Sequence, residues 1–341
     1  MKIAFTMPTA GAGRWAWQGW VNAFNFFGHR VYDTRLISDI EELNPDLLIC
    51  TTSDPRPDFI EWRRRHPENR VALNVLAYTN EDLPGINNVG VQATQGNVEY
   101  AYDMRADVVF AQFSEPYRRL LLGKWEDLGF RLSGMEMAAD AVVYPYPDFT
   151  QGVESIRNPD IFYVGGRWAY KAQNLDRYLL PILKESESRT VVGRGWPFPT
   201  TDMSEHNVGL QMKHAKVVPN IHEPHSTHGG YDVVERVFKT LYCGGLCISD
   251  SVREISEGFD LHDGEHLIMC ESPDEYRHMI ADAIKNNEDY DLMRERGHNK
   301  VARFHTYFNR AALLLLDLEM LEEFEAASAK LHKWHRDMGI R

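Results

Sequence analysis

Three short segments in the second half of the chain place glycine and a cationic side chain directly after an apolar run. Their sequences are YVGGRWAYK (163–171), VVGRGWP (191–197) and HGGYDVVERVFK (228–239). Glycine lets the backbone approach a ligand closely, and a helix that starts after such a loop directs free N–H groups and a positive dipole end at an anion. The cations that add charge near these loops are Arg167, Lys171, Arg194, Arg236 and Lys239. The pattern predicts a diphosphate site, and hence a site for a nucleotide.

Two common nucleotide motifs are absent from the sequence. A Walker A motif (GxxxxGK[ST]) does not occur, and no GxGxxG motif follows a predicted strand, so neither ATP hydrolysis nor dinucleotide redox chemistry is indicated. The segment HEPHSTH (222–228) carries three histidines and Glu223, which suggests a metal site. Pro224 disfavours one regular helical face between the first two histidines. We therefore predict that this segment contacts a sugar or a phosphate and holds no metal.

The elements that must position these residues alternate between strands and helices along the chain, which indicates parallel sheets covered by helices. Short apolar runs, typical of strands buried on both faces, predict strands at 2–7, 30–34, 46–52, 71–78, 106–113, 141–147, 160–167, 189–196, 215–221, 245–250 and 265–270. Helices are predicted at 14–27, 115–123, 172–185, 231–243, 273–286 and, as one long amphipathic tail, 308–335.

The segment 148–159 lacks periodicity and is interpreted as a linker between domains. We therefore expect two Rossmann-like doubly wound α/β domains, at 1–150 and 158–307, followed by a terminal helix at 308–341. In such sheets, ligands bind beyond the carboxyl ends of the strands.

Composition narrows the class of protein. The 37 Lys and Arg residues against 50 Asp and Glu residues give a formal net charge of −13, which disfavours binding to nucleic acid unless one face is locally basic. The longest apolar run, AALLLL at 311–316, is far too short to span a bilayer. The four cysteines form no CxxC pair. These features predict a reduced, cytoplasmic protein without a membrane span.

The block from Ala215 to Arg310 resembles the C-terminal domain of the group 1 glycosyltransferases with GT-B architecture, particularly the branch similar to the spore-maturation protein CgeB. The matching segments are VVPNIHEPHSTHGGYDVVERVFKTLYCGGLCISD (217–250), GEHLIMCESPDEYRHMI (264–280) and HTYFNR (305–310). The resemblance implies two Rossmann-like domains, with a C-terminal helix that crosses back to the first. It also implies that the second domain holds a nucleotide-sugar donor such as a UDP-sugar, that the first holds the acceptor, and that catalysis needs no metal.

The same resemblance implies donor-binding roles for individual residues. Arg236 is expected to contact the donor diphosphate, and Asn220 and His222 to lie near the sugar. Lys239 stands where the family usually has a Glu that binds the ribose hydroxyls. An ammonium group cannot accept those hydrogen bonds, so either Lys239 meets a phosphate or Glu235 holds the ribose. Further expected donor contacts are Gly165, Gly166, Arg167, Gly193, Arg194, Trp196 and Thr240. A last group is expected at the N-terminus of the helix predicted at 231–243 and comprises His228, Gly229, Gly230 and Tyr231.

The first half offers candidates for acceptor binding and for a catalytic base. A glycine-rich loop follows the first predicted strand, and we expect Gly13, Arg14 and Trp15 to line the acceptor. An inverting transfer needs a base on the acceptor hydroxyl, whereas a retaining transfer needs no protein base of this kind. The candidate bases at strand ends are Asp54, Glu81, Glu99 and Glu115. The predicted catalytic set comprises Glu81, Glu99, His222 and Arg236.

These observations predict a glycosyltransferase that moves a hexosyl or pentosyl group from a nucleoside-diphosphate sugar to a hydroxyl acceptor on a glycan, a small molecule or a modified nucleobase. Three alternatives stay open. One is a viral or phage enzyme that glycosylates DNA bases. Another is a non-catalytic nucleotide-sugar binder, with Lys239 as the trace of lost activity. The third is a nucleotide-sugar epimerase of the same architecture.

Overall fold

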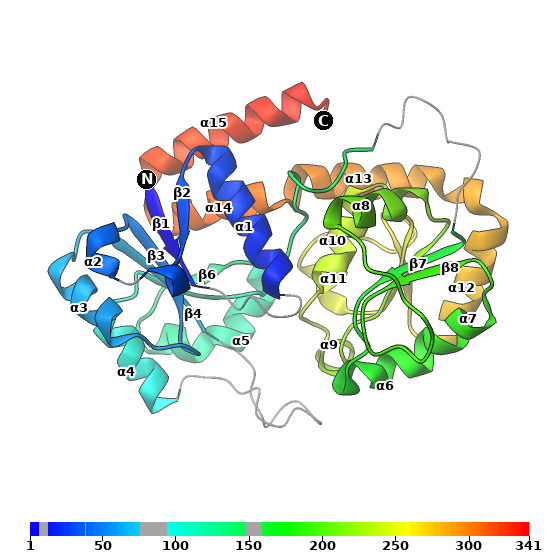
Figure 1. Ribbon diagram of the computed structural model, residues 1–341, viewed down its shortest axis with the longest axis horizontal. Helices are drawn as coiled ribbons and strands as arrows, with labels where there is room; N and C mark the ends of the chain where they lie inside the picture. Colours follow the sequence, from blue (N-terminus) through cyan, green and yellow to red (C-terminus); the bar gives the residue numbers. More distant parts are fainter. Residues whose placement is uncertain (7–12, 38, 76–93, 148–158, 341) are drawn as a thin grey trace. The chain divides into compact units, whose positions relative to one another are not determined.

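The computed structural model describes residues 1–6, 13–37, 39–75, 94–147 and 159–340 (Figure 1). Two compact units result: unit 1 comprises Met1–Glu136 and Tyr307–Gly339, and unit 2 comprises Met137–Thr306 together with the last residues of the chain. Each unit is built on parallel strands covered by helices. The predicted α/β class is therefore confirmed.

Unit 1 contains a parallel sheet with the strand order β2-β1-β3-β4-β5-β6. The strands are β1 (Lys2–Phe5), β2 (Arg30–Asp33), β3 (Leu47–Thr51), β4 (Arg70–Asn74), β5 (Val108–Ala111) and β6 (Leu132–Gly134). The central strand β3 is buried along its whole length, as expected for a parallel strand covered on both faces. The connecting helices are α1 (Gly13–Phe27), η1 (Thr34–Leu36), α2 (Ile40–Leu43), α3 (Pro57–Arg65), α4 (Gln95–Asp103) and α5 (Glu115–Asp127).

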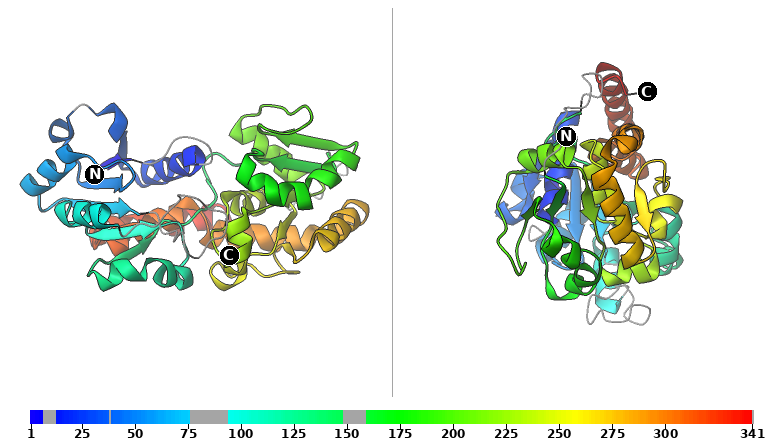
Figure 2. Two further views of the ribbon diagram at one scale, coloured as in Figure 1. Left: turned by 90° about the horizontal axis from the view of Figure 1, so that it is seen from below. Right: turned by 90° about the vertical axis from the view of Figure 1, so that its right-hand side faces the viewer.

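The C-terminal tail returns to unit 1 as two helices and not as the single helix predicted from the sequence. They are α14 (Tyr307–Asp317) and α15 (Leu321–Asp337), and both pack beside α1 (Figures 1 and 2). The chain turns at Glu319, whose φ of 58° lies in the left-handed region and ends the helical run. The Glu319 carboxylate accepts a hydrogen bond of 2.7 Å from Arg131, next to β6, which fixes this turn on the unit 1 sheet.

Unit 2 contains strands β9 (Val218–Asn220), β10 (Cys247–Asp250) and β11 (Ile268–Cys270) in the order β11-β10-β9, and a parallel pair of β7 (Ile161–Val164) and β8 (Arg189–Val192). The pair continues the sheet because the Phe162 N–H donates to the Val217 carbonyl at 3.0 Å, immediately before β9. All pairings are parallel. The carboxyl ends of β7, β8, β9 and β10 therefore share one edge, where ligands of such sheets bind.

The helices of unit 2 are α6 (Ala169–Tyr178), α7 (Leu180–Glu185), α8 (Glu205–His214), α9 (Pro224–Gly229), α10 (Glu235–Tyr242), α11 (Arg253–Glu257), α12 (Pro273–Lys285), η2 (Asn287–Tyr290) and α13 (Asp291–Phe304). The start of α12 agrees with the sequence, because the Ser272 hydroxyl caps it by accepting from the Glu275 N–H at 3.2 Å. The short helix α9, which opens with a proline, was not predicted.

Residues 141–144 form a turn and 145–147 have no regular secondary structure, so the strand predicted at 141–147 is wrong. The Asp140 carboxylate accepts hydrogen bonds from the N–H groups of Val142 (3.0 Å) and Val143 (3.4 Å), which bends the backbone locally. The next residue, Tyr144, is buried inside unit 2. The chain thus enters unit 2 at Met137, ahead of the segment 148–159 that the sequence suggests as the linker. Residues 148–158 lie outside the described part of the chain.

Candidate functional site

The loops after β7 and β8 are joined through their backbones. The Gly165 N–H donates to the Val192 carbonyl and the Arg167 N–H to the Arg194 carbonyl, both at 2.8 Å. Gly193 has a φ of +127°, and a Cβ built there would lie 2.5 Å from the Gly165 carbonyl oxygen. Only glycine permits that approach. Two of the three predicted glycine loops therefore form one compact structure at the sheet edge.

Arg236 lies at the same edge, although it comes from α10. Its Nε donates to the Val164 carbonyl (2.6 Å) at the end of β7, and its Nη1 donates to Asn220 Oδ1 (3.1 Å) at the end of β9. The guanidinium also lies 4.6 Å from the Tyr163 ring centroid, and the side chain is only 8% exposed. A guanidinium has five N–H donors, and these two bonds leave donors for an anion.

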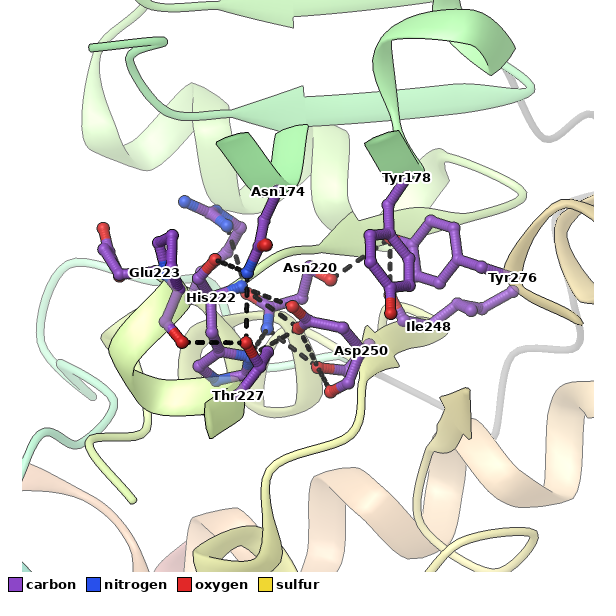
Figure 3. A network of polar contacts seen from close by, with 12 residues as sticks. Asn174, Tyr178, Asn220, His222, Glu223, Thr227, Ile248, Asp250 and Tyr276 are labelled. Atoms are coloured by element: carbon purple, nitrogen blue, oxygen red, sulfur yellow. Dashed lines mark hydrogen bonds and ion pairs between the residues drawn. The ribbon is translucent and has the colours of Figure 1, made fainter. Parts of the chain in front are cut away.

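A buried polar network surrounds the ends of β9 and β10 (Figure 3). The His222 N–H donates to both oxygens of Asp250 at 3.0 Å, and His222 Nδ1 lies 2.6 Å from Asp250 Oδ1. Asp250 thereby holds Nδ1 as the protonated nitrogen of the ring. The Asn220 amide donates to Ser249 Oγ at 2.9 Å, and Tyr276 donates to the Asn220 carbonyl at 3.2 Å. Asn220 thus connects Arg236 to this network.

The helix α9 is fastened to α6 beside this network. Asn174 of α6 donates to the His222 carbonyl and to Thr227 Oγ1, both at 3.2 Å (Figure 3). Lys171 of α6 forms a buried ion pair of 2.9 Å with Glu223. Burial alone would raise the pKa of the Glu223 carboxyl, but the charge and hydrogen bond of Lys171 outweigh it and the pKa is lowered. The charge of Lys171 is therefore balanced by Glu223.

The glycine pair 229–230 closes α9 and does not open α10, so the third loop differs from the prediction. Gly230, with a φ of +80°, is the left-handed cap after α9, and a Cβ there would lie 2.5 Å from Arg253 Nε. The helix α10 begins later than predicted, at Glu235. Of the residues expected at its N-terminus, Tyr231 is buried and His228 is exposed on α9.

Three further residues expected to bind the donor face an internal network. The Lys239 ammonium, 5% exposed, lies 3.5 Å from Glu235 and 3.7 Å from Glu205, and donates to the Tyr144 hydroxyl at 3.3 Å. Thr240 is fully buried, and its hydroxyl is directed at Met212 of α8. Lys239 and Glu235 thus compensate each other's charge.

The remaining candidates of unit 2 belong to the two joined loops. Arg167 forms hydrogen bonds of 2.7 and 2.5 Å with Asp176. Gly166 and Arg194 are exposed, and no described residue forms an ion pair with the Arg194 side chain. Trp196 is buried and donates to the Gly165 carbonyl at 2.9 Å, so its indole supports the loop.

The described candidates of unit 1 have few contacts with other side chains. Gly13 begins α1, and the exposed Arg14 lies with its guanidinium carbon 5.3 Å from the Trp15 ring centroid. Glu99 is exposed on α4 and accepts a hydrogen bond of 2.8 Å from Gln95. Asp54 and Glu115 are exposed as well. Glu81 lies outside the described residues.

Sequence reasoning missed two participants of the site. Asp250 orients His222, and its signal was the strand GLCISD, which ends in a carboxylate at the ligand-binding edge. Asn174 ties α9 to α6, and nothing in the sequence around it distinguishes it from a surface residue. Within the described ranges, no group of three His, Cys, Asp or Glu side chains is arranged to hold a metal ion. None of the described helices is long and apolar enough to cross a bilayer.

Comparisons with known proteins concern the fold of the chain. Residues 173–316 match the family model described as glycosyl transferase-like, and no curated protein matches the chain. Among solved structures, the chain is similar to the sucrose-phosphate synthase of Thermosynechococcus elongatus (TM-score 0.59, 11% identity, 96% of this chain and 100% of that chain). It is also similar to Anabaena HepE in complex with UDP-glucose (0.53, 10%, 98% and 100%).

A third similar structure is that of TarM, with a TM-score of 0.56 and 11% identity over 84% of this chain. The chain spans only 56% of TarM. At these identities the likeness concerns the fold. The predicted GT-B fold, with two Rossmann-like units and a C-terminal return to the first, is confirmed.

Proposed function

From the GT-B fold and the glycosyl transferase-like match of unit 2, we propose that the chain transfers a sugar from a UDP-sugar to a hydroxyl acceptor. Unit 2 binds the donor in this proposal, and unit 1 supplies the acceptor site. The choice of UDP is supported by HepE, which was solved with UDP-glucose. The hexosyl group is preferred to a pentosyl group for the same reason.

The observation that carries the proposal is the environment of Arg236. Its guanidinium is buried at the ligand-binding edge of the sheet and held by the Val164 carbonyl and Asn220. These neutral acceptors orient the guanidinium but do not cancel its charge. No carboxylate of the described residues forms an ion pair with Arg236. A buried cation that lacks such a partner is costly, and a bound diphosphate would supply the negative charge. Charge-assisted bonds from arginine to phosphate oxygens are strong and geometrically specific.

In the proposed reaction, the bond between the anomeric carbon and the diphosphate oxygen breaks, and a bond from that carbon to the acceptor oxygen forms. UDP leaves with the bonding electrons, and Arg236 and Arg194 stabilise its growing charge. The acceptor hydroxyl loses its proton, to Glu81 or Glu99 in an inverting reaction. His222, oriented by Asp250, supports the wall of the site near the sugar, and Gly13, Arg14 and Trp15 contact the acceptor.

The donor-binding half of the proposal is tested by calorimetric titration with UDP. Arg236→Ala should weaken UDP binding by at least about tenfold, since hydrogen bonds to charged groups contribute roughly 1.5–3 kcal/mol. Arg236→Lys keeps the charge but not the two planar bonds and should show an intermediate loss. Arg277→Ala is the matched control, because Arg277 is exposed on α12. Equal UDP affinity of the Arg236→Ala and wild-type proteins would overturn the proposed site.

The transfer itself is tested by release of UDP from a panel of UDP-sugars, with and without candidate acceptors. Acceptor-dependent release supports a glycosyltransferase. Binding without release in any combination identifies a non-catalytic binder, and sugar interconversion without an acceptor identifies an epimerase. Double-stranded DNA with hydroxymethylated bases belongs in the acceptor panel, because it separates a DNA-modifying enzyme from one that acts on glycans or small molecules.

A further inference from the structure

Trp168 is unusual among the tryptophans of the chain. The sequence contains eight, all within the described ranges, and Trp168 alone is exposed, with 54% of its surface accessible; the others are buried or half-buried. Tryptophan is on average a strongly buried residue, because its large apolar ring is stabilised by leaving water. An exposed indole beside a ligand-binding edge therefore needs a reason.

The indole is supported from one side by two further rings. The Trp168 and Tyr170 ring centroids are 5.5 Å apart, and Tyr170 stacks on His225 at 5.9 Å with an interplanar angle of 14°. His225 in turn is held by Asp232, whose carboxylate lies 2.8 Å from Nε2. We call Trp168, Tyr170 and His225 the aromatic stack. It connects the start of α6 to α9 and leaves Trp168 as its exposed end.

The backbone position of Trp168 is fixed as well. Trp168 is the N-cap residue of α6 and makes no side-chain capping bond, although this position normally favours Ser, Thr, Asp or Asn. It directly follows Arg167, whose N–H is bonded to the loop after β8. A large aromatic ring thus occupies the N-cap position in place of a capping side chain, next to a residue whose backbone is hydrogen-bonded to the loop after β8.

Trp168 lies close in the chain to the proposed diphosphate site. Gly165 is three residues upstream, and a Cβ built on it would lie 2.7 Å from Arg236 Nη2. Three residues of chain span at most about 11 Å between Cα atoms. A nucleotide whose diphosphate binds Arg236 therefore has the indole within reach of its nucleoside part.

We propose that Trp168 stacks on the nucleobase of the bound nucleotide donor. The inference rests on the proposed function, because it takes the diphosphate to lie at Arg236. Stacking on an aromatic side chain tolerates any base, since every base has a flat π-face. Trp168 therefore contributes affinity for nucleoside diphosphates in general, and selection of uracil over other bases comes from other residues.

The experiment compares UDP, ADP and inorganic pyrophosphate as ligands of the whole chain, with pyrophosphate measured by displacement of UDP. Trp168→Ala should weaken UDP and ADP by a similar factor, about tenfold, in line with alanine substitutions at base-stacking positions, and leave pyrophosphate unchanged. Trp168→Phe should retain most of the affinity while losing part of the UDP-induced quenching of tryptophan fluorescence. Phe304→Ala is the control, because Phe304 is another exposed aromatic residue of unit 2 (45%).

The possible results distinguish a failure of the stacking inference from a failure of the proposed glycosyltransferase function. Unchanged UDP affinity of Trp168→Ala, with wild-type binding intact, overturns the stacking assignment alone. So does a parallel loss for pyrophosphate, which would indicate a distorted loop. A normal UDP affinity with a raised KM for the acceptor would place an acceptor ring on Trp168 instead. Absence of UDP binding in the wild-type protein would refute both the inference and the proposed donor site.

Discussion

Replacement of Gly193 by alanine tests whether the two joined loops of unit 2 need glycine. The added Cβ would lie 2.5 Å from the Gly165 carbonyl oxygen and 2.7 Å from its carbonyl carbon. Both are backbone atoms that cannot rotate away. The φ of +127° adds a second cost, since this region is open essentially to glycine alone. Strained backbone and overpacking each cost about 1–3 kcal/mol, so we expect a loss of about 2–6 kcal/mol in the free energy of unfolding.

The assay is thermal and urea unfolding followed by fluorescence, which includes the buried Trp196 beside Gly165. For a unit of this size, 1 kcal/mol corresponds to about 2–4 °C in Tm, so Gly193→Ala should lower the Tm of unit 2 by about 10 °C and weaken UDP binding. Gly166→Ala is the matched control, because its added Cβ would meet nothing closer than 3.6 Å. Equal Tm values for the two variants would refute the steric argument.

Three further predictions concern buried titratable groups. Lys239→Met removes the cation beside the buried Glu235 and should lower the free energy of unfolding by about 3 kcal/mol; an unchanged urea midpoint would contradict the ion pair. Burial raises the pKa of the Cys50 and Cys247 thiols to about 12, so both should resist DTNB at pH 8 in the folded protein and react in urea. Burial lowers the pKa of His298 from 6.5 to about 4. The unfolded chain therefore binds a proton that the folded chain does not, and the free energy of unfolding should fall as the pH drops from 6.5 towards 4, by up to about 3 kcal/mol. His298→Gln should flatten that decline.

The parallel sheets could be predicted because their strands are continuous apolar runs. The exceptions have local causes. The strand β6, with the sequence LSG, is too short and polar to stand out. The run at 141–147 is apolar enough for a strand, but the Asp140 carboxylate accepts hydrogen bonds from the N–H groups of Val142 and Val143, and the backbone turns there. The tail is periodic throughout, and the left-handed Glu319 lies at the turn that divides it into two helices.

The candidate site could be predicted where a glycine has one natural structural role, and less well where the same glycine could have several roles. Gly165 and Gly193 follow strands, and close approach of their loops is the natural interpretation. The pair 229–230 could equally begin or end a helix. In the structure it ends α9, a helix that was not predicted. The pairing of Lys171 with Glu223 joins residues 52 positions apart, which no local pattern reveals. The pairing of Lys239 with Glu235 follows the i, i+4 rule and was accessible from the sequence.

These pairings decide which cations are available to an anion. Of the five predicted at the sheet edge, three have carboxylate partners: Arg167 with Asp176, Lys171 with Glu223, and Lys239 with Glu235. A diphosphate would have to displace a carboxylate to use any of them, which offsets most of the gain. Arg236 is held by neutral oxygens, and the Arg194 side chain forms no ion pair with a described residue. Of the five predicted cations, these two guanidinium groups are therefore the ones whose charge is not compensated by a described carboxylate. In the proposed function, Arg194→Ala should accordingly lower UDP affinity, whereas Arg167→Ala should have a smaller effect.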